Sequence, residues 1–237
     1  MTSLAERISD PKRVLFYAAT CALLAIIVAA GFGPSYIGAM LSGVGTPLVL
    51  HFHATVFAGW IALFTTQALL PAFGRVDLHR KLGKFGIGYA VFLVAVGLIT
   101  TVNRVAFYFN DGQEARAKAF LIAPLSDMIV FPIFFSAAIA YRRQPEIHKR
   151  LMLVATVMLT IAAVGRMEFL PSSYFATIAV WLSPLYLAMI YDFYKSRIIH
   201  PAYVIGLLTL AIVPLRGRLT PSEEWQSFAT WFVAMIT

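Results

Sequence analysis

The chain has 237 residues, of which 60% are hydrophobic and only 13% are charged. Soluble domains carry about 25% charged residues, so this chain lacks the charge that a water-facing surface needs. A net charge of +8 on a soluble protein would suggest nucleic acid. Here the Lys and Arg residues cluster in short segments between apolar runs, where they meet lipid headgroups. We therefore exclude nucleic-acid binding and predict a protein that contacts membrane lipids.

Apolar runs long enough to be candidate membrane spans recur along the chain. They cover residues 14–32, 46–72, 83–106, 117–141, 148–168, 173–194 and 201–215. The first run follows basic residues, as in a signal peptide, but it is too long for one and lacks a clean cleavage site. The seventh is short and ends at Pro214 and Arg216. The sequence predicts an all-α polytopic membrane helix bundle of about seven spans, forming one domain over residues 1–237.

The C-terminal segment 221–236 has a different pattern. Thr220 is a candidate N-cap, with Pro221 at the first helical position and acidic residues in the first turn. Its apolar side chains recur at helical spacing, at Trp225, Phe228, Phe232 and Met235. This segment is too short to cross a bilayer. It predicts an amphipathic helix that lies at the membrane interface or docks on the bundle.

The distribution of Lys and Arg predicts the orientation. With the N-terminus inside, the inner segments hold thirteen of the nineteen basic residues and the outer segments hold six. Cytoplasmic loops of membrane proteins carry this excess, so the N-terminus is predicted to be cytoplasmic. Seven spans without a visible inverted repeat and with few broken helices argue against a secondary transporter.

Two histidines lie in the second run, at His51 and His53. Two residues apart on a helix they point away from each other, so they cannot both bind one metal ion. His53 shares its face with Phe57, Trp60, Phe64 and Gln67, whereas His51 shares a face with small residues typical of helix packing. His53 is therefore the candidate cofactor or metal ligand, and His51 is expected to hydrogen-bond a neighbouring helix. Alternatively, both make only such bonds.

Asp127 is the acidic residue deepest in the fourth run. A buried carboxylate needs a partner, and Arg104 or Arg166, at the outer ends of the third and fifth runs, could reach it. One interpretation is an ion pair that holds the bundle together. The other is a proton or quinol site with Asp127 beside His53, since ionisable groups within spans often mark function.

His79 and His148 precede the third and fifth runs, at equivalent depths on the predicted inner side. Each is followed by basic residues and then by an apolar run, in LHRKLGK and PEIHKRLM. One interpretation is a cationic belt at the headgroups, and the flanking charges suggest that both rings face water. The other is a haem with one axial imidazole from each helix.

The segments HFHATVFAGWIALFTTQ, LHRKLG, PLSDMIVF and PEIHKRLMLVAT…GR resemble a functionally uncharacterised family of bacterial polytopic inner-membrane proteins. The resemblance covers about residues 46–168. It implies a bacterial inner membrane and draws attention to His53, Trp60, Gln67, His79, Asp127, His148 and Arg166, but it implies no reaction. LHRKLG and HKRLM also resemble helix-start motifs of small membrane proteins associated with haem or oxidase assembly. No second outer histidine is present to complete a diheme pair with His53.

Several hypotheses remain open at this point. The chain could be a redox-linked protein that binds haem b or a quinone. It could be an accessory or assembly subunit of a larger respiratory or photosynthetic complex, with protein partners and with His53 binding a pigment. The third hypothesis is an enzyme acting on a lipid or small molecule, with a metal at His53 and Asp127.

Overall fold

The computed structural model describes residues 11–43 and 45–237, and within them the chain is helical without strands. Six helices are long and apolar enough to cross a membrane, and a bent pair of shorter helices would make a seventh span. The prediction of a polytopic all-α bundle is confirmed. The short seventh run passes this test over Pro201–Leu219, which includes a 3-10 continuation.

The first four described helices are α2 (Pro11–Leu41), α3 (Leu48–Ala72), α4 (Val76–Asn110) and α5 (Glu114–Ala140). They are followed by α6 (Pro145–Met158), α7 (Ile161–Val164), α8 (Tyr174–Trp181), α9 (Ser183–Ser196), α10 (Pro201–Ile212), η1 (Val213–Leu219) and α11 (Glu223–Ile236). Gly74 and Gly112 have φ of 75° and 73° and lie in the tight turns before α4 and α5. Glycine adopts this left-handed conformation without steric cost, which allows α3 and α4 to end at these turns.

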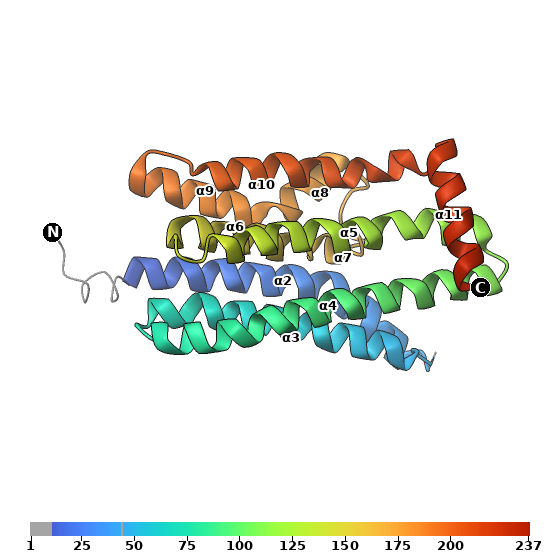
Figure 1. Ribbon diagram of the computed structural model, residues 1–237, viewed down its shortest axis with the longest axis horizontal. Coiled ribbons are helices and arrows are strands. Elements are labelled where there is room, and N and C mark those ends of the chain that lie inside the picture. Colours follow the sequence, from blue (N-terminus) through green and yellow to red (C-terminus); the bar gives the residue numbers. More distant parts are fainter. Residues whose placement is uncertain (1–10, 44) are drawn as a thin grey trace.

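The long helices run side by side, so the bundle has two ends (Figure 1). One end, which we call the N-terminal end, holds the start of α2 and the connections at residues 73–75, 141–144 and 197–200. The opposite end, which we call the α11 end, holds the α4–α5 connection and α11. The connections rich in Lys and Arg therefore lie together at the N-terminal end.

Two of the predicted spans are broken, contrary to the expectation of continuous helices over 148–168 and 173–194. The helix that begins at Pro145 is interrupted after Met158, and α8 meets α9 at an angle of 57°. A hydrogen bond connects the two broken regions, because the Trp181 Nε1–H at the end of α8 donates to the Val157 carbonyl of α6 over 2.8 Å. The Val157 carbonyl also accepts from the backbone N–H and the hydroxyl of Thr160, so the acceptor at this break is satisfied within the bundle, as the interior of a membrane protein requires.

The C-terminal amphipathic helix is present and docks on the bundle. In Figure 1, α11 crosses the ends of α4 and α5. It buries Ala229 and Val233 in a small cluster with Val105 and Leu121. Its N-cap is Ser222, whose hydroxyl accepts from the backbone of Trp225, so the prediction of Thr220 as the cap was wrong.

Candidate functional site

A cavity of about 220 Å³ lies inside the bundle towards the N-terminal end. Helices α2, α3, α4, α5, α6, α9 and α10 all contribute to its wall. Much of the wall is apolar and aromatic, with polar side chains placed between. The lining residues are Phe16, Tyr17, Thr20, Cys21, Trp60, Leu63, Phe64, Gln67, Ala68, Pro71, His79, Gly83, Gly86, Phe135, Ile139, Pro145, His148, Lys149, Met152, Leu153, Tyr191, Asp192 and Tyr203.

His79 and His148 meet at this cavity from the first turns of α4 and α6. Their ring centroids are 6.3 Å apart and the ring planes are 78° apart. The expectation that both rings face water was wrong, because both are partly buried and line the cavity. After His79, Arg80 and Lys81 are exposed, but after His148, Lys149 lines the cavity and Arg150 is buried. Flanking basic residues therefore do not decide which way the imidazoles point.

The hydrogen bonds of these rings define their tautomer. His79 Nδ1 lies 3.1 Å from the Gln67 carbonyl oxygen, and His148 Nδ1 lies 2.8 Å from the Ala138 carbonyl oxygen. A carbonyl oxygen can only accept, so each Nδ1 carries a hydrogen and Nε2 is the ring nitrogen left for a further partner. Neither Nε2 has a hydrogen-bonding partner in the described part of the chain.

Trp60 and Gln67 add two more polar groups without partners. Both line the cavity from α3, and Trp60 Nε1 and Gln67 Oε1 are buried without a hydrogen bond among the described residues. Trp60 is only 2% exposed and is fixed by edge contacts to Phe131 and Phe135 of α5. A buried donor or acceptor without a partner costs about 1–3 kcal/mol. The cavity is therefore bordered by groups that a bound molecule would satisfy.

A buried ion pair forms another part of the wall. Arg150 of α6 donates from Nε and Nη2 to the two carboxylate oxygens of Asp192 of α9, over 2.8 and 2.9 Å. Glu146 accepts from Arg150 Nη1 over 2.6 Å, and the guanidinium lies 5.5 Å from the centre of the Tyr203 ring. Sequence analysis missed this pair. The available signal was Asp192, a carboxylate near the end of an otherwise apolar run.

His53 does not line the cavity. Its ring stacks on Phe57 with a centroid distance of 4.1 Å, and its Nδ1 is buried without a partner among the described residues. Within residues 11–43 and 45–237, His53 belongs to no group of three or more His, Cys, Asp or Glu side chains that could hold a metal ion. His51, in contrast, bonds through Nδ1 to the Tyr36 hydroxyl of α2, which confirms its predicted role in helix packing.

Asp127 forms a salt bridge, but not with the predicted partners. Arg216 of η1 donates from Nη1 to Asp127 Oδ1 and, over 2.6 Å, to the Ser126 hydroxyl. The expectation of Arg104 or Arg166 was wrong, because η1 continues α10 alongside α5 and places Arg216 beside Asp127. Arg166 instead donates to the Ala162 carbonyl and lies over the Phe32 ring.

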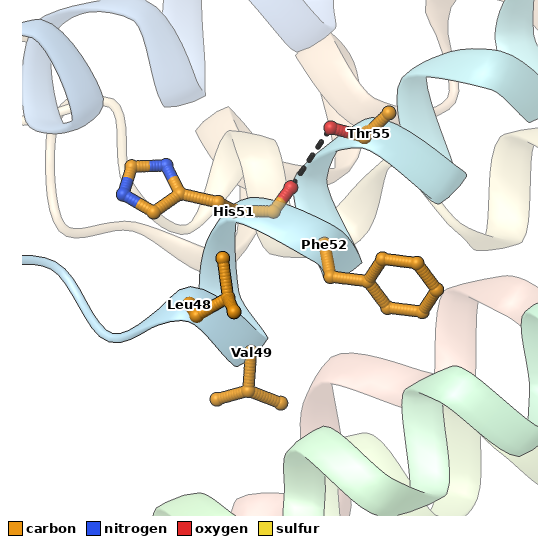
Figure 2. A pocket seen from close by; sticks show the side chains of 5 residues that line it. All are labelled: Leu48, Val49, His51, Phe52 and Thr55. Carbon is orange, nitrogen blue, oxygen red and sulfur yellow. Dashed lines mark hydrogen bonds between the residues drawn. The ribbon is translucent and has the colours of Figure 1, made fainter.

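A second concavity lies at the start of α3. Figure 2 shows its five lining residues, Leu48, Val49, His51, Phe52 and Thr55. All belong to the first turns of one helix, and the drawn hydrogen bond, from the Thr55 hydroxyl to the His51 carbonyl, is internal to that helix. It is a shallow surface feature without converging polar groups.

The structure thus brings four of the predicted residues together, Trp60, Gln67, His79 and His148, and leaves His53, Asp127 and Arg166 outside the cavity. Searches against family models, characterised proteins and solved structures found no match to the chain.

Proposed function

We propose that this chain is a redox-linked membrane protein that binds the ring of a quinone or quinol in the cavity. The observation that carries the proposal is the set of four unpartnered polar groups around one space: two imidazole Nε2 atoms, the Trp60 N–H and the Gln67 Oε1. Ligand sites are typically apolar cavities with a few converging polar groups of this kind.

The hydrogen-bonding capacity matches both redox forms. A quinol hydroxyl donates, and the imidazole Nε2 atoms and Gln67 Oε1 accept. A quinone carbonyl only accepts, and the Trp60 N–H donates. Oxidation of a quinol releases two protons and two electrons. Two imidazoles beside the ring are suitable proton acceptors, and the electrons pass to a redox partner in the membrane.

The size of the cavity favours a single ring. Sites for drug-sized molecules have volumes of about 300–1,000 Å³, whereas this cavity measures about 220 Å³. A quinone head fits this space with its isoprenoid tail between helices or in the bilayer. Aromatic residues such as Phe64 and Phe135 in the wall provide faces for the ring to stack on.

Haem b is a second candidate, favoured by one observation. Metal-bound imidazole nitrogens lie about 2 Å from the metal, so two axial rings on one iron have centroids roughly 6 Å apart. His79 and His148 have a centroid separation of 6.3 Å. Both also donate Nδ1–H to a backbone carbonyl, as metal-bound histidines commonly do. A haem would require other wall helices to move, because its macrocycle is larger than the cavity of about 220 Å³.

The test is a binding titration on the detergent-solubilised protein. A short-tailed quinone should quench the fluorescence of Trp60, and the quenching should be lost in Trp60→Phe. His79→Phe and His148→Phe each remove one acceptor and should weaken binding about ten-fold. His200→Asn, outside the cavity, should bind like the wild type. Unchanged binding in both histidine variants would overturn the proposal, and a Soret band after incubation with haem, lost in the same variants, would favour haem.

We further infer a bacterial inner membrane with the N-terminus in the cytoplasm. The support is the basic excess at the N-terminal end of the bundle. Because Cys21 is buried, single cysteines can be introduced as accessibility probes. Arg142→Cys should react with an impermeant thiol reagent only in broken cells, and Asn110→Cys, at the exposed last residue of α4 before the α4–α5 connection, should react in intact spheroplasts. The reverse pattern would invert the orientation.

A further inference from the structure

Two arginines contact the Tyr108 ring at the α11 end of the bundle, away from the cavity. The guanidinium carbon of Arg104 lies 4.7 Å from the centre of the Tyr108 ring, and that of Arg116 lies 4.5 Å from it. Both guanidinium groups therefore contact one ring, and Arg116 also donates from Nη1 to Gln113 Oε1 over 2.9 Å. Arg104 also donates from Nη2 to the Tyr108 hydroxyl over 2.8 Å.

Arg166 extends the cluster from the segment after α7. A repulsive electrostatic interaction links it to Arg104, and an attractive one links it to Tyr108. Its own bonds use one nitrogen, Nη1, which donates to the Ala162 carbonyl over 2.7 Å. The remaining guanidinium nitrogens are left for another acceptor.

None of these three arginines has a carboxylate within salt-bridge distance among the described residues. Three carboxylates of this region have other partners: Glu114 pairs with Lys118, Asp127 pairs with Arg216, and Asp111 accepts from Gln113. Glu168, two residues after Arg166, is not within salt-bridge distance of it. Like charges held close together repel, and an anion between them removes the repulsion. The chain itself supplies no such anion at this place within the part that the structure describes.

The position of the cluster identifies the level of the membrane. Helix α4 has 35 residues, which corresponds to a length of about 50 Å, whereas the hydrocarbon core is about 30 Å thick. Its last turns therefore extend into the headgroup region. Arg104 is in those turns, and Arg116 is in the first turn of α5 across the tight connection.

We propose that Arg104, Arg116 and Arg166 form a binding site for a phosphate group, supplied by an anionic phospholipid at this surface of the bilayer or by free phosphate. Guanidinium groups bind phosphate oxygens through two parallel hydrogen bonds, and this geometry makes arginine the preferred residue for such sites. The Tyr108 ring holds the guanidinium groups of Arg104 and Arg116 in place by cation–π contact before the anion binds. Binding is independent of the quinone site.

The test measures lipid binding to the delipidated full chain in neutral detergent by native mass spectrometry. Phosphatidylglycerol should bind about five- to ten-fold more tightly than phosphatidylcholine. Arg104→Gln and Arg116→Gln should each abolish most of this preference. Arg142→Gln, an exposed arginine at the N-terminal end that also donates to a backbone carbonyl, is the matched control and should keep it.

Two further arms distinguish the possible outcomes. Arg104→Lys keeps the positive charge but loses the two parallel N–H donors of the guanidinium group. It should therefore retain only part of the preference for phosphatidylglycerol. If inorganic phosphate displaces phosphatidylglycerol at millimolar concentration, the site takes free phosphate as well, and the proposal stands with that source. If the wild type shows no preference for phosphatidylglycerol and no effect of phosphate, or if the Gln variants retain the preference while folding normally, the proposal is overturned.

Discussion

Two groups of buried polar side chains in this bundle differ in whether their polar atoms have hydrogen-bonding partners. Asp127 and Arg216 satisfy one another, with Ser126 as a further acceptor for Arg216. Around the cavity, Trp60 and Gln67 line the wall, and their Nε1 and Oε1 atoms are buried without a partner in the described part of the chain. A costly polar group inside a span is thus insufficient evidence for a binding site. Missing partners beside a cavity are the better criterion.

The largest expected effect comes from breaking the satisfied pair. Arg216→Met should lower the free energy of unfolding by about 3–5 kcal/mol, because it leaves the Asp127 carboxylate buried without its counter-charge. Denaturation in mixed detergent micelles measures this loss. Arg218→Met, two residues along, has no ion pair among the described residues to lose and is the control. The double variant Asp127→Asn/Arg216→Met should recover most of the stability, and equal stability of the two single variants would contradict the structural role.

A smaller change in the free energy of unfolding, an increase this time, is expected from a substitution in the cavity wall. Gln67→Met removes the unpartnered acceptor, so the ligand-free protein should become more stable by about 1 kcal/mol. Its affinity for the quinone should fall at the same time.

Thr156 provides the matched control for this comparison. Its hydroxyl is also buried without a partner among the described residues, and the residue is 0% exposed, but it does not line the cavity. Thr156→Val should therefore stabilise the protein without changing quinone affinity. If Gln67→Met destabilises the ligand-free protein, or if both variants weaken binding equally, the distinction between the two regions fails.

The smallest effect is a pH dependence at His200, which lies between α9 and α10. Its Nδ1 accepts from the Ala202 backbone N–H and so caps α10. Loss of contact with water, and then the charge of Arg150, lower the pKa of His200 below its ordinary value. The unfolded chain therefore binds the proton more readily, and stability is lost as the pH falls through about 6.5 and below.

The loss should not exceed about 1 kcal/mol, the size of a typical N-cap. It can be measured as the difference in unfolding free energy between about pH 8 and about pH 5. His200→Asn keeps a capping side chain without a titratable group, so its acid-induced loss should be smaller than that of the wild type. Identical pH profiles would show that the cap does not titrate.

The sequence predicted the positions of the helices better than the side-chain contacts between them. The apolar runs located the helices, and the packing role of His51 followed from the small residues on its face. The partner of Asp127 could not be predicted because Arg216 is 89 residues away and lies after the last apolar run. The break after Met158 has no proline or glycine within it. It depends on Trp181 from another helix, which periodicity within one segment cannot reveal.

The candidate site was predicted only in part, and for a similar reason. Trp60 and Gln67 share a helical face, so the pattern identified them together. The direction of the two imidazoles depends on carbonyl oxygens of Gln67 and Ala138 in neighbouring helices. The basic residues beside each histidine suggested water instead. Local charge therefore gave the depth of His79 and His148 correctly but not the direction of their rings.

The Arg150 network has a consequence for biosynthesis. Asp192 follows Arg150 by 42 residues, so α6 emerges from the ribosome and reaches the membrane before its main counter-ion has been translated. An arginine entering a bilayer without a counter-charge is costly. Glu146, one turn earlier on the same helix, travels with Arg150 and already bonds to it. Glu146 can partly neutralise the Arg150 charge while α6 inserts. Once α9 has inserted, Asp192 accepts hydrogen bonds from Nε and Nη2 of Arg150.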